Sequence, residues 1–478
     1  MAIANQMYID GRWVAAADGA TLDVVDPATE EVVDCVPVAT AADLDGALAA
    51  ADRGWRAWRE QDAWTRSAAV RRAGEWIRGH ADEVAAVLTE EQGKPLAEAR
   101  GEVLAAADQF DWYADEARRI YGRVVEGHSR DHRLLVLRQP VGPVAGFSPW
   151  NFPALLSARK IAPAVAAGCS IVIKPAAEAP RTTMMLARAC HEARIPAGVV
   201  NVVTGRSSMI SRQMLASPVI RKVSLTGSVA VGREILRLAA DGIKTVSMEL
   251  GGHSPVLVFP DADVDRAAEL CARGKYRNNG QVCIAASRFF VHEDVADRFT
   301  ARFVEVTASL KLGDGRQPGV DVGPLANRRR LEATEELVRD ALDRGATLAH
   351  GGRRPGGMAR GFYYVPTVLT NVDSSMRLMT EEPFCPIAPI TTFRDLDEVI
   401  ERANATELGL AAYVFTTSTR TAFLASEQLE VGMVGVNNLV IATAEAPFGG
   451  IKLSGYGREG GSEGIEAYTV AKYVNIQL

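Results

Sequence analysis

Two residues, Cys283 and Glu249, have side chains and surroundings suited to chemistry on a carbonyl. Cys283 ends the segment Lys275-Tyr-Arg-Asn-Asn-Gly-Gln-Val-Cys, and Glu249 stands 34 residues earlier, before a Gly-Gly turn. A thiol can add to a carbonyl carbon and leave a thioester, and a carboxylate whose pKa is raised by burial can activate the water that cleaves it. Each residue alone has a plainer interpretation, as a buried structural thiol or as a salt-bridged carboxylate.

Three further positions could assist such chemistry. Asn151 lies in Ser148-Pro-Trp-Asn-Phe-Pro, where two prolines stiffen the loop and the amide can donate to an oxyanion. Lys174 ends a predicted strand, and residues 226–232 (TGSVAVG) follow a strand and open a helix, a position that suits a pyrophosphate. Turn stabilisation, a solvated lysine and a packing turn are the alternatives.

Composition limits the kind of partner. The 478 residues, 47% hydrophobic and 23% charged, suit a globular protein of two or three domains. A net charge of −6 gives no reason to bind nucleic acid or an anionic membrane. Six cysteines without CxxC or Cys/His spacing predict neither a disulfide framework nor a metal site. The start lacks a signal-peptide pattern, and the longest apolar stretch, 161–173, is too short to span a bilayer, so we expect a cytoplasmic protein acting on small molecules.

The elements that must position these residues follow an α/β pattern. Residues 40–121 predict several helices, and 121–126 and 133–138 predict two strands of an arm that has no core of its own. Between residues 143 and 250 short β-branched runs alternate with helical ones, the pattern of a doubly wound parallel sheet. A second alternating region covers 255–440. The tail from Pro447 is too Gly-rich to predict a regular element before a last strand at 469–476.

Taken together, these segments resemble the aldehyde dehydrogenase superfamily along almost the whole chain. The motifs that carry the resemblance stand in the family's order: PWNFP (149–153), KPA (174–176), TGSxxVG (226–232), ELGG (249–252), GQVC (280–283), EEPF (381–384) and PFGGxKxSGxGRE (447–459). The resemblance implies a Rossmann-type doubly wound cofactor domain at 1–118 and 141–250, a second α/β catalytic domain at 251–447, and a small β oligomerisation arm at 119–140 and 460–478. It also implies a homodimer or homotetramer.

By that resemblance, Cys283 is the nucleophile, Asn151 holds the oxyanion, and Glu249 activates the water that cleaves the thioester. Relatives that transfer the acyl group to coenzyme A lack this carboxylate, so we expect a free acid. The cofactor, NADP or NAD, is expected to contact Trp150, Lys174, Ala177, Gly227, Ser228, Gly232, Glu382 and Phe384. Members that prefer NAD have Glu where this chain has Ala177, and the loss of that carboxylate predicts use of NADP, unless Glu178 takes its place.

The substrate is indicated by two arginines. Arg159 and Arg277 match positions that bind the distal carboxylate in succinate-semialdehyde dehydrogenases, and a guanidinium suits a carboxylate. Thr443 lies near a third contact of that site. The resemblance favours succinate semialdehyde, with α-ketoglutarate or glutarate semialdehyde, or a general aldehyde, as alternatives. A catalytically silent nucleotide-binding scaffold is the alternative outside enzymes.

Overall fold

A mixed eight-stranded sheet forms the first half of the fold. The computed structural model describes residues 6–478, so the first five residues of the expected 1–118 segment lie outside it. Five central strands run parallel: β7 (Val144–Ser148), β8 (Ile171–Pro175), β9 (Val200–Val202), β10 (Lys222–Thr226) and β11 (Thr245–Glu249). Most of their residues are buried, and strands covered on both faces have continuous apolar runs. The predicted doubly wound parallel sheet is confirmed.

Short antiparallel strands extend this sheet at both edges. β1 (Met7–Ile9) and β2 (Arg12–Val14) lie beyond β9, and β21 (Gly455–Tyr456) lies beside β11. The prediction that the Gly-rich tail forms no regular element was wrong. The tail forms β20 (Ile451–Lys452), β21 and the helix α15 (Gly461–Glu466). Glycine is required here because a Cβ on Gly455 would lie 1.9 Å from the Met248 carbonyl oxygen.

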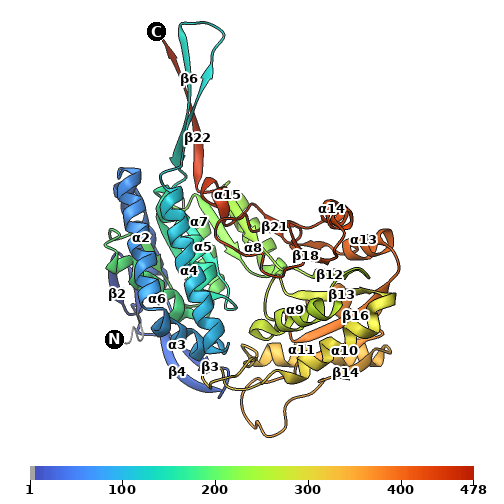
Figure 1. Cartoon of the computed structure of the whole chain (residues 1–478). Coiled ribbons are helices and arrows are strands. Elements are labelled where there is room, and N and C mark those ends of the chain that lie inside the picture. Colours follow the sequence, from blue (N-terminus) through green and yellow to red (C-terminus); the bar gives the residue numbers. More distant parts are fainter. Residues whose placement is uncertain (1–5) are drawn as a thin grey trace.

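Helices cover both faces of the first sheet, and those expected at 40–121 are present (Figure 1). They are α1 (Ala41–Trp58), α2 (Ala63–Gly79), α3 (Ala81–Gln92) and α4 (Leu96–Glu116), followed by α5 (Pro153–Ala167), α6 (Pro180–Glu192), α7 (Ser207–Ala216) and α8 (Val229–Asp241). Thr40 and Asp43 form a capping box that fixes the start of α1. All residues of α5 are buried, so this helix is held on every side.

A second sheet of seven strands forms the other half. Its order is β14 (Thr347–His350), β15 (Thr367–Thr370), β16 (Ile387–Phe393), β13 (Ala286–His292), β12 (Ser254–Val258), β18 (Ala411–Phe415) and β19 (Met433–Val436). The helices around it are α9 (Val264–Tyr276), α10 (Ala296–Ser309), α11 (Arg328–Asp343), α13 (Leu396–Asn404) and α14 (Thr419–Gln428). All neighbours are parallel except β14 and β15. This is the second α/β region.

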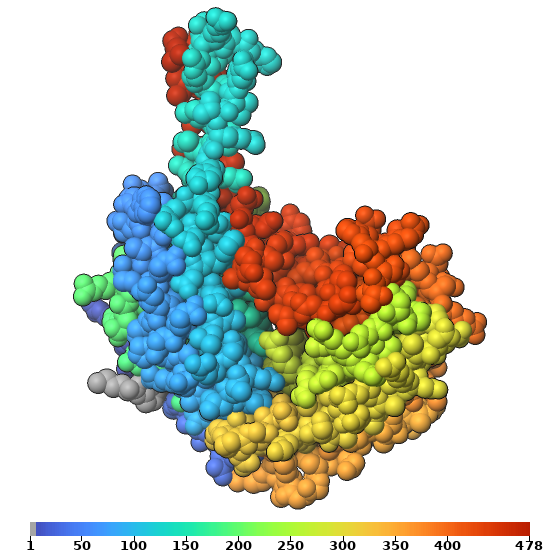
Figure 2. Space-filling view, viewed as in Figure 1, coloured from blue at the N-terminus to red at the C-terminus, as the bar shows by residue number. Residues whose placement is uncertain are grey.

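A three-stranded arm projects from the body (Figures 1 and 2). It consists of β5 (Arg123–Glu126), β6 (His132–Pro140) and β22 (Thr469–Gln477), with β6 in the middle. β22 pairs with β6 along its whole length. The two segments 119–140 and 460–478 thus meet in one sheet, although the boundaries given for the domains stay a prediction. In the described chain, no helix combines the length and apolar character needed to cross a membrane.

Candidate active site

The carboxyl ends of β8, β7 and β10 lie side by side in the first sheet. The chain passes from β7 to β8 and β9 on one side of β7, then returns to β10 and β11 on the other. Ligands of open α/β sheets bind where the strand order reverses in this way. Trp150 and Asn151 follow β7, and Gly227 and Ser228 follow β10, so four of the predicted residues lie at this switch point.

The residues around the switch point fit a dinucleotide. Ser228 is exposed and caps α8, its Oγ accepting a hydrogen bond from Val231 N at 3.4 Å. A Cβ on Gly232 would lie 2.6 Å from Leu250 Cδ1, so glycine lets the helix start approach the sheet. Lys174 Nζ donates to Ser207 Oγ at 2.7 Å, and burial lowers the pKa of this lysine to about 8. An exposed helix N-terminus at the same sheet edge as Lys174 suits phosphate and ribose groups.

Glu382 and Phe384 reach the same region from the second half of the chain. Gly252 N donates to Glu382 Oε1 at 3.0 Å, and burial raises the pKa of Glu382 to about 7. Phe384 has a left-handed backbone, with φ of 47°, and its ring contacts the Trp150 ring edge-on at 5.5 Å. The structure therefore brings together Trp150, Glu382 and Phe384.

Cys283 lies in the loop that follows the 3-10 turn η1 (Arg277–Gly280) and precedes β13. Its side chain is half-buried. Burial raises the pKa of the thiol to about 12, with a further increase from the Glu382 carboxylate. A Cβ on Gly252 would lie 2.5 Å from the Cys283 carbonyl oxygen, so the Gly-Gly turn after Glu249 lies directly against the loop of Cys283.

Glu249 ends β11 and is 2% exposed. Neither carboxylate oxygen accepts a hydrogen bond from any group in residues 6–478. Burial raises the pKa of Glu249 well above its usual range, and the nearby Glu459 adds to this increase. Glu249 also raises the pKa of the Cys283 thiol, so the two groups share one electrostatic environment. A buried carboxylate with free lone pairs can accept a proton from a water molecule.

Asn151 is 4% exposed, and its amide is oriented toward the loop of Cys283. Asn151 Nδ2 donates to the Gln281 carbonyl oxygen at 3.1 Å, two residues before the cysteine. An amide nitrogen carries two N–H donors, so one donor stays free for a substrate oxygen. The structure thus places Cys283, Glu249 and Asn151 around one region.

The two arginines differ in their burial. Arg159, in α5, is 1% exposed and stacks on the Phe448 ring at 4.2 Å. Its Nε and Nη2 have no hydrogen-bond partner in the described structure. Arg277 is exposed, and its guanidinium lies 5.0 Å from the centre of the Phe152 ring. Phe152, Phe448 and the half-buried Cys283 belong to one apolar cluster, so both arginines lie beside the cluster of Cys283.

Thr443 follows Ala442, which packs against the apolar cluster of Phe152 and Cys283. It lines a cavity of about 500 Å³ together with Gln109, Trp112 and Leu155. Of the described residues that line this cavity, none is an arginine. Leu155 belongs to the same apolar cluster as Phe152, so the cavity that Thr443 lines adjoins the site.

Ala177 is half-buried, and the neighbouring carboxylate is engaged elsewhere. Asn327 Nδ2 donates to Glu178 Oε1 at 3.4 Å, and Asn327 also caps α11.

Cys385 is fully buried, and its carbonyl lies 2.3 Å from where a Cβ on Gly280 would be. Nothing in the structure explains why a cysteine stands there. Residues 6–478 contain no group of three or more His, Cys, Asp or Glu side chains arranged to hold a metal ion.

Sequence reasoning missed Lys94, Glu102 and Asn278, which surround Asn151. The available signal was Lys94 between Gly93 and Pro95 at a predicted helix end, where a lysine is usually solvated. Here Lys94 is 1% exposed.

Comparison with known proteins places this geometry among related chains. The model of the aldehyde dehydrogenase family matches residues 13–474. The glutarate-semialdehyde dehydrogenase of Pseudomonas putida KT2440 is 43% identical over 99% of this chain and 98% of its own length. The NADP-dependent succinate-semialdehyde dehydrogenase of Escherichia coli K12 is 42% identical over the same shares. The crystal structure of succinate-semialdehyde dehydrogenase from Burkholderia pseudomallei superposes with a TM-score of 0.97 at 42% identity, covering 99% of this chain and 98% of that one.

Proposed function

The chain belongs to the aldehyde dehydrogenase family, and on that premise we propose that it oxidises a short semialdehyde with a distal carboxylate to the free acid. Succinate semialdehyde is the favoured substrate. Glutarate semialdehyde and α-ketoglutarate semialdehyde carry the same distal group and are the alternatives. The cofactor is NADP or NAD.

The residues of the site divide the reaction between them. The Cys283 thiol loses its proton to solvent and its Sγ adds to the aldehyde carbon, and Asn151 Nδ2 with the Cys283 main-chain N–H holds the oxyanion. When bound, the oxidised cofactor supplies the acceptor for the hydride that leaves this carbon. Cys283 then carries the acyl group as a thioester. Glu249 takes a proton from the attacking water, which releases the acid and restores the thiol. Its raised pKa makes it a stronger base than an ordinary carboxylate.

One observation carries the substrate assignment. Arg159 is buried beside the apolar cluster of Cys283 with two guanidinium donors that no group in the described chain satisfies. Unsatisfied donors on a buried cation are costly unless a ligand meets them. A carboxylate at the far end of a short aldehyde provides two acceptor oxygens and the opposite charge. Arg277 would add a second cation from the exposed side.

The test compares succinate semialdehyde with butyraldehyde, which lacks the carboxylate, using NAD and NADP in parallel. We expect the parent enzyme to prefer the carboxylated aldehyde. Arg159→Met/Arg277→Met should lower kcat/KM for succinate semialdehyde about 10- to 100-fold or more, because a hydrogen bond to a charged group contributes roughly 1.5–3 kcal/mol. Its butyraldehyde activity should persist.

The matched control is Arg298→Met, a change to an exposed arginine of α10 that should leave both activities unaltered. An unaltered preference in the double variant would refute the carboxylate pocket and favour a general aldehyde dehydrogenase. If neither aldehyde reacted, the silent scaffold would become the better interpretation.

We also infer that the arm joins subunits into a homodimer or homotetramer, as its shape and exposure suggest. A preference for NADP is supported by Ala177 and by the bond of Glu178 to Asn327. The cytoplasmic location stays a prediction.

A further inference from the structure

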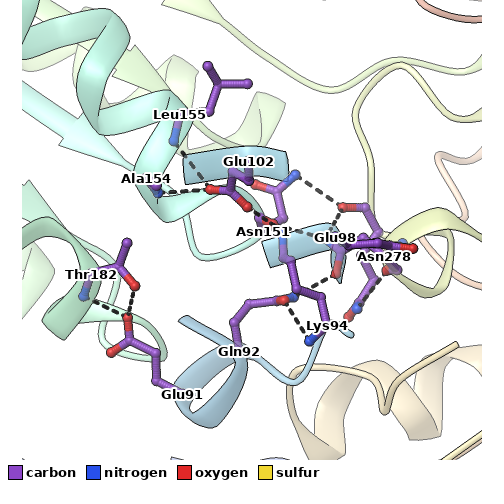
Figure 3. A network of polar contacts seen from close by, with 11 residues as sticks. Glu91, Gln92, Lys94, Glu98, Glu102, Asn151, Ala154, Leu155, Thr182 and Asn278 are labelled. Atoms are coloured by element: carbon purple, nitrogen blue, oxygen red, sulfur yellow. Dashed lines mark hydrogen bonds and ion pairs between the residues drawn. The ribbon is translucent and has the colours of Figure 1, made fainter. Parts of the chain in front are cut away.

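Lys94 forms an ion pair in the interior, beside the loop of Asn151. Its Nζ donates to Glu102 Oε2 at 2.5 Å, and the side chains of the two residues are 0% and 1% exposed. The same Nζ donates to the Asn151 carbonyl oxygen at 2.7 Å and lies 3.9 Å from the centre of the Phe152 ring. The other oxygen of Glu102 accepts from Ala154 N at 2.8 Å and Leu155 N at 3.2 Å, at the start of α5 (Figure 3). The pair therefore holds the chain on both sides of Phe152.

Asn278 connects this loop to the loop of the nucleophile. Its Nδ2 donates to the Asn151 carbonyl oxygen at 2.9 Å and to the Gln281 carbonyl oxygen at 3.3 Å. Its Oδ1 accepts from Gln92 Nε2 at 2.9 Å (Figure 3). Its backbone is left-handed, with φ of 47°. One amide thus bridges two carbonyls, one two residues before Cys283 and the other on Asn151.

These contacts determine where the Asn151 amide points. The Asn151 carbonyl accepts two hydrogen bonds, from Lys94 and Asn278, which fixes the peptide plane next to the side chain. The Asn151 amide in turn donates to Gln281 O, the carbonyl that Asn278 also contacts. One N–H of Asn151 is therefore held, and the direction of the other follows from the geometry of the planar amide.

On the basis of the proposed function, we propose that Lys94 and Asn278 are positioning residues for the oxyanion. They hold the Asn151 carbonyl so that the free N–H of the Asn151 amide meets the oxygen of the aldehyde when Cys283 attacks. Neither residue touches the reacting atoms, and both act through Asn151. A displacement of about 1 Å in such a group is enough to lower a rate roughly 100-fold.

The test separates the Lys94 hydrogen bond from the ion pair. Glu102→Gln keeps an oxygen for Ala154 N and Leu155 N and keeps Lys94 on Asn151. Lys94→Met/Glu102→Gln has the same cap without the donor, and removes both charges of the ion pair. We expect the double variant to show a burst of nicotinamide reduction about 10- to 100-fold slower than the Glu102→Gln variant, because the oxyanion donor is misaligned. The burst amplitude per subunit and the alkylation rate of Cys283 should be the same in the double variant as in the Glu102→Gln variant.

Asn278→Asp tests the second contact. It retains an acceptor for Gln92 but loses the donors to both carbonyls, and we expect a similar decrease in the burst rate. Asn201→Asp is the matched control, because the buried Asn201 also donates from Nδ2 to two main-chain carbonyls, Gly198 at 2.8 Å and Ile171 at 3.3 Å, at the opposite end of β8 and β9. It should leave the burst rate unchanged.

The decisive measurement repeats these comparisons in an Asn151→Ala background. If a residue acts only through the Asn151 amide, its substitution should then lower the burst rate less than about 3-fold, because the effects of coupled residues are not additive. The positioning role would be refuted if a substitution lowered the burst rate equally in both backgrounds, or if it left the burst rate unaltered in the enzyme that retains Asn151. All rates are measured with succinate semialdehyde and butyraldehyde. The ratio of the rates with the two aldehydes tests the carboxylate pocket. The ratio of the rates of two variants with the same aldehyde tests the positioning role.

Discussion

In the proposed reaction, release of the product depends on Glu249. In Glu249→Gln the nucleophile and the oxyanion donor stay, so acylation should proceed while hydrolysis stops. We expect a burst of about one reduced cofactor per active subunit, followed by a steady-state rate lower by about 100-fold or more, the usual contribution of a general base. Stopped-flow absorbance measures both phases. A variant that turned over at the parent's rate would remove Glu249 from deacylation.

Cys283 should react slowly as a free thiol at neutral pH. Burial raises its pKa to about 12, above the ordinary value of 9.0, so the thiolate fraction keeps increasing through the alkaline range. The thiolate is the nucleophile, and its alkylation rate should therefore rise about tenfold per pH unit through pH 9 in the cofactor-free enzyme. Iodoacetamide labelling, with Cys283→Ser to subtract the other thiols, measures this rate. A plateau near pH 8 would contradict the expectation.

Ala177 should control the choice of cofactor. In Ala177→Glu, a carboxylate would accept from the ribose 2′-hydroxyl of NAD and repel the 2′-phosphate of NADP. We expect the ratio of kcat/KM for NADP to that for NAD to fall at least about 10-fold, a change of roughly 1.4 kcal/mol. Ala177→Gln, which has a similar size without the charge, should shift the ratio less. Equal shifts would show that size decides instead.

The strands that are buried on both faces of a sheet could be predicted from the sequence. β7, β8 and β10 are buried on both faces, and the expected phosphate position at residues 226–232 followed from the strand predicted before it. β21 was not predictable, because it exists only through its pairing with β11 and contains a glycine that local propensity opposes. Lys94 was missed for a related reason, since the acid that pairs with it and the carbonyl that it binds lie on other elements.

The turn after β11 brings the two halves of the site together, and it requires a glycine. A Cβ on Gly252 would lie 2.5 Å from the Cys283 carbonyl and 2.9 Å from Leu410 Cβ. Gly252→Ala must therefore displace the loop of Cys283, and we expect kcat/KM to fall about 100-fold. Gly101→Ala is the control, because Gly101 lies in α4 with nothing within 4 Å of a new Cβ. It should preserve activity and raise the free energy of unfolding by about 0.5–1 kcal/mol, measured by urea denaturation. Full activity in Gly252→Ala would show that the loop can yield.

At the scale of the whole molecule, the arm presents an apolar surface that the chain itself leaves uncovered. Val124, Leu137, Val470 and Ile476 are 71%, 42%, 40% and 40% exposed. Residues paired across neighbouring strands point to the same face of a sheet, and successive residues along a strand point to opposite faces. By this rule, the strand register places all four side chains on one face of the arm. We call this surface the apolar arm face. Exposed apolar surface on a three-stranded sheet that stands away from the core suits contact with a second copy.

Val124→Lys/Leu137→Lys should therefore shift the protein from the proposed oligomer toward the monomer. Two lysines on the apolar arm face would bury unpaired charge in any contact between subunits, which is strongly unfavourable. Sedimentation velocity over a range of concentrations measures the shift. Ile243→Lys is the matched control, because Ile243 is 92% exposed on the body after α8, so the same change in side chain occurs away from the arm. An oligomer that persisted in the double variant, or one lost equally in the control, would place the subunit contact elsewhere.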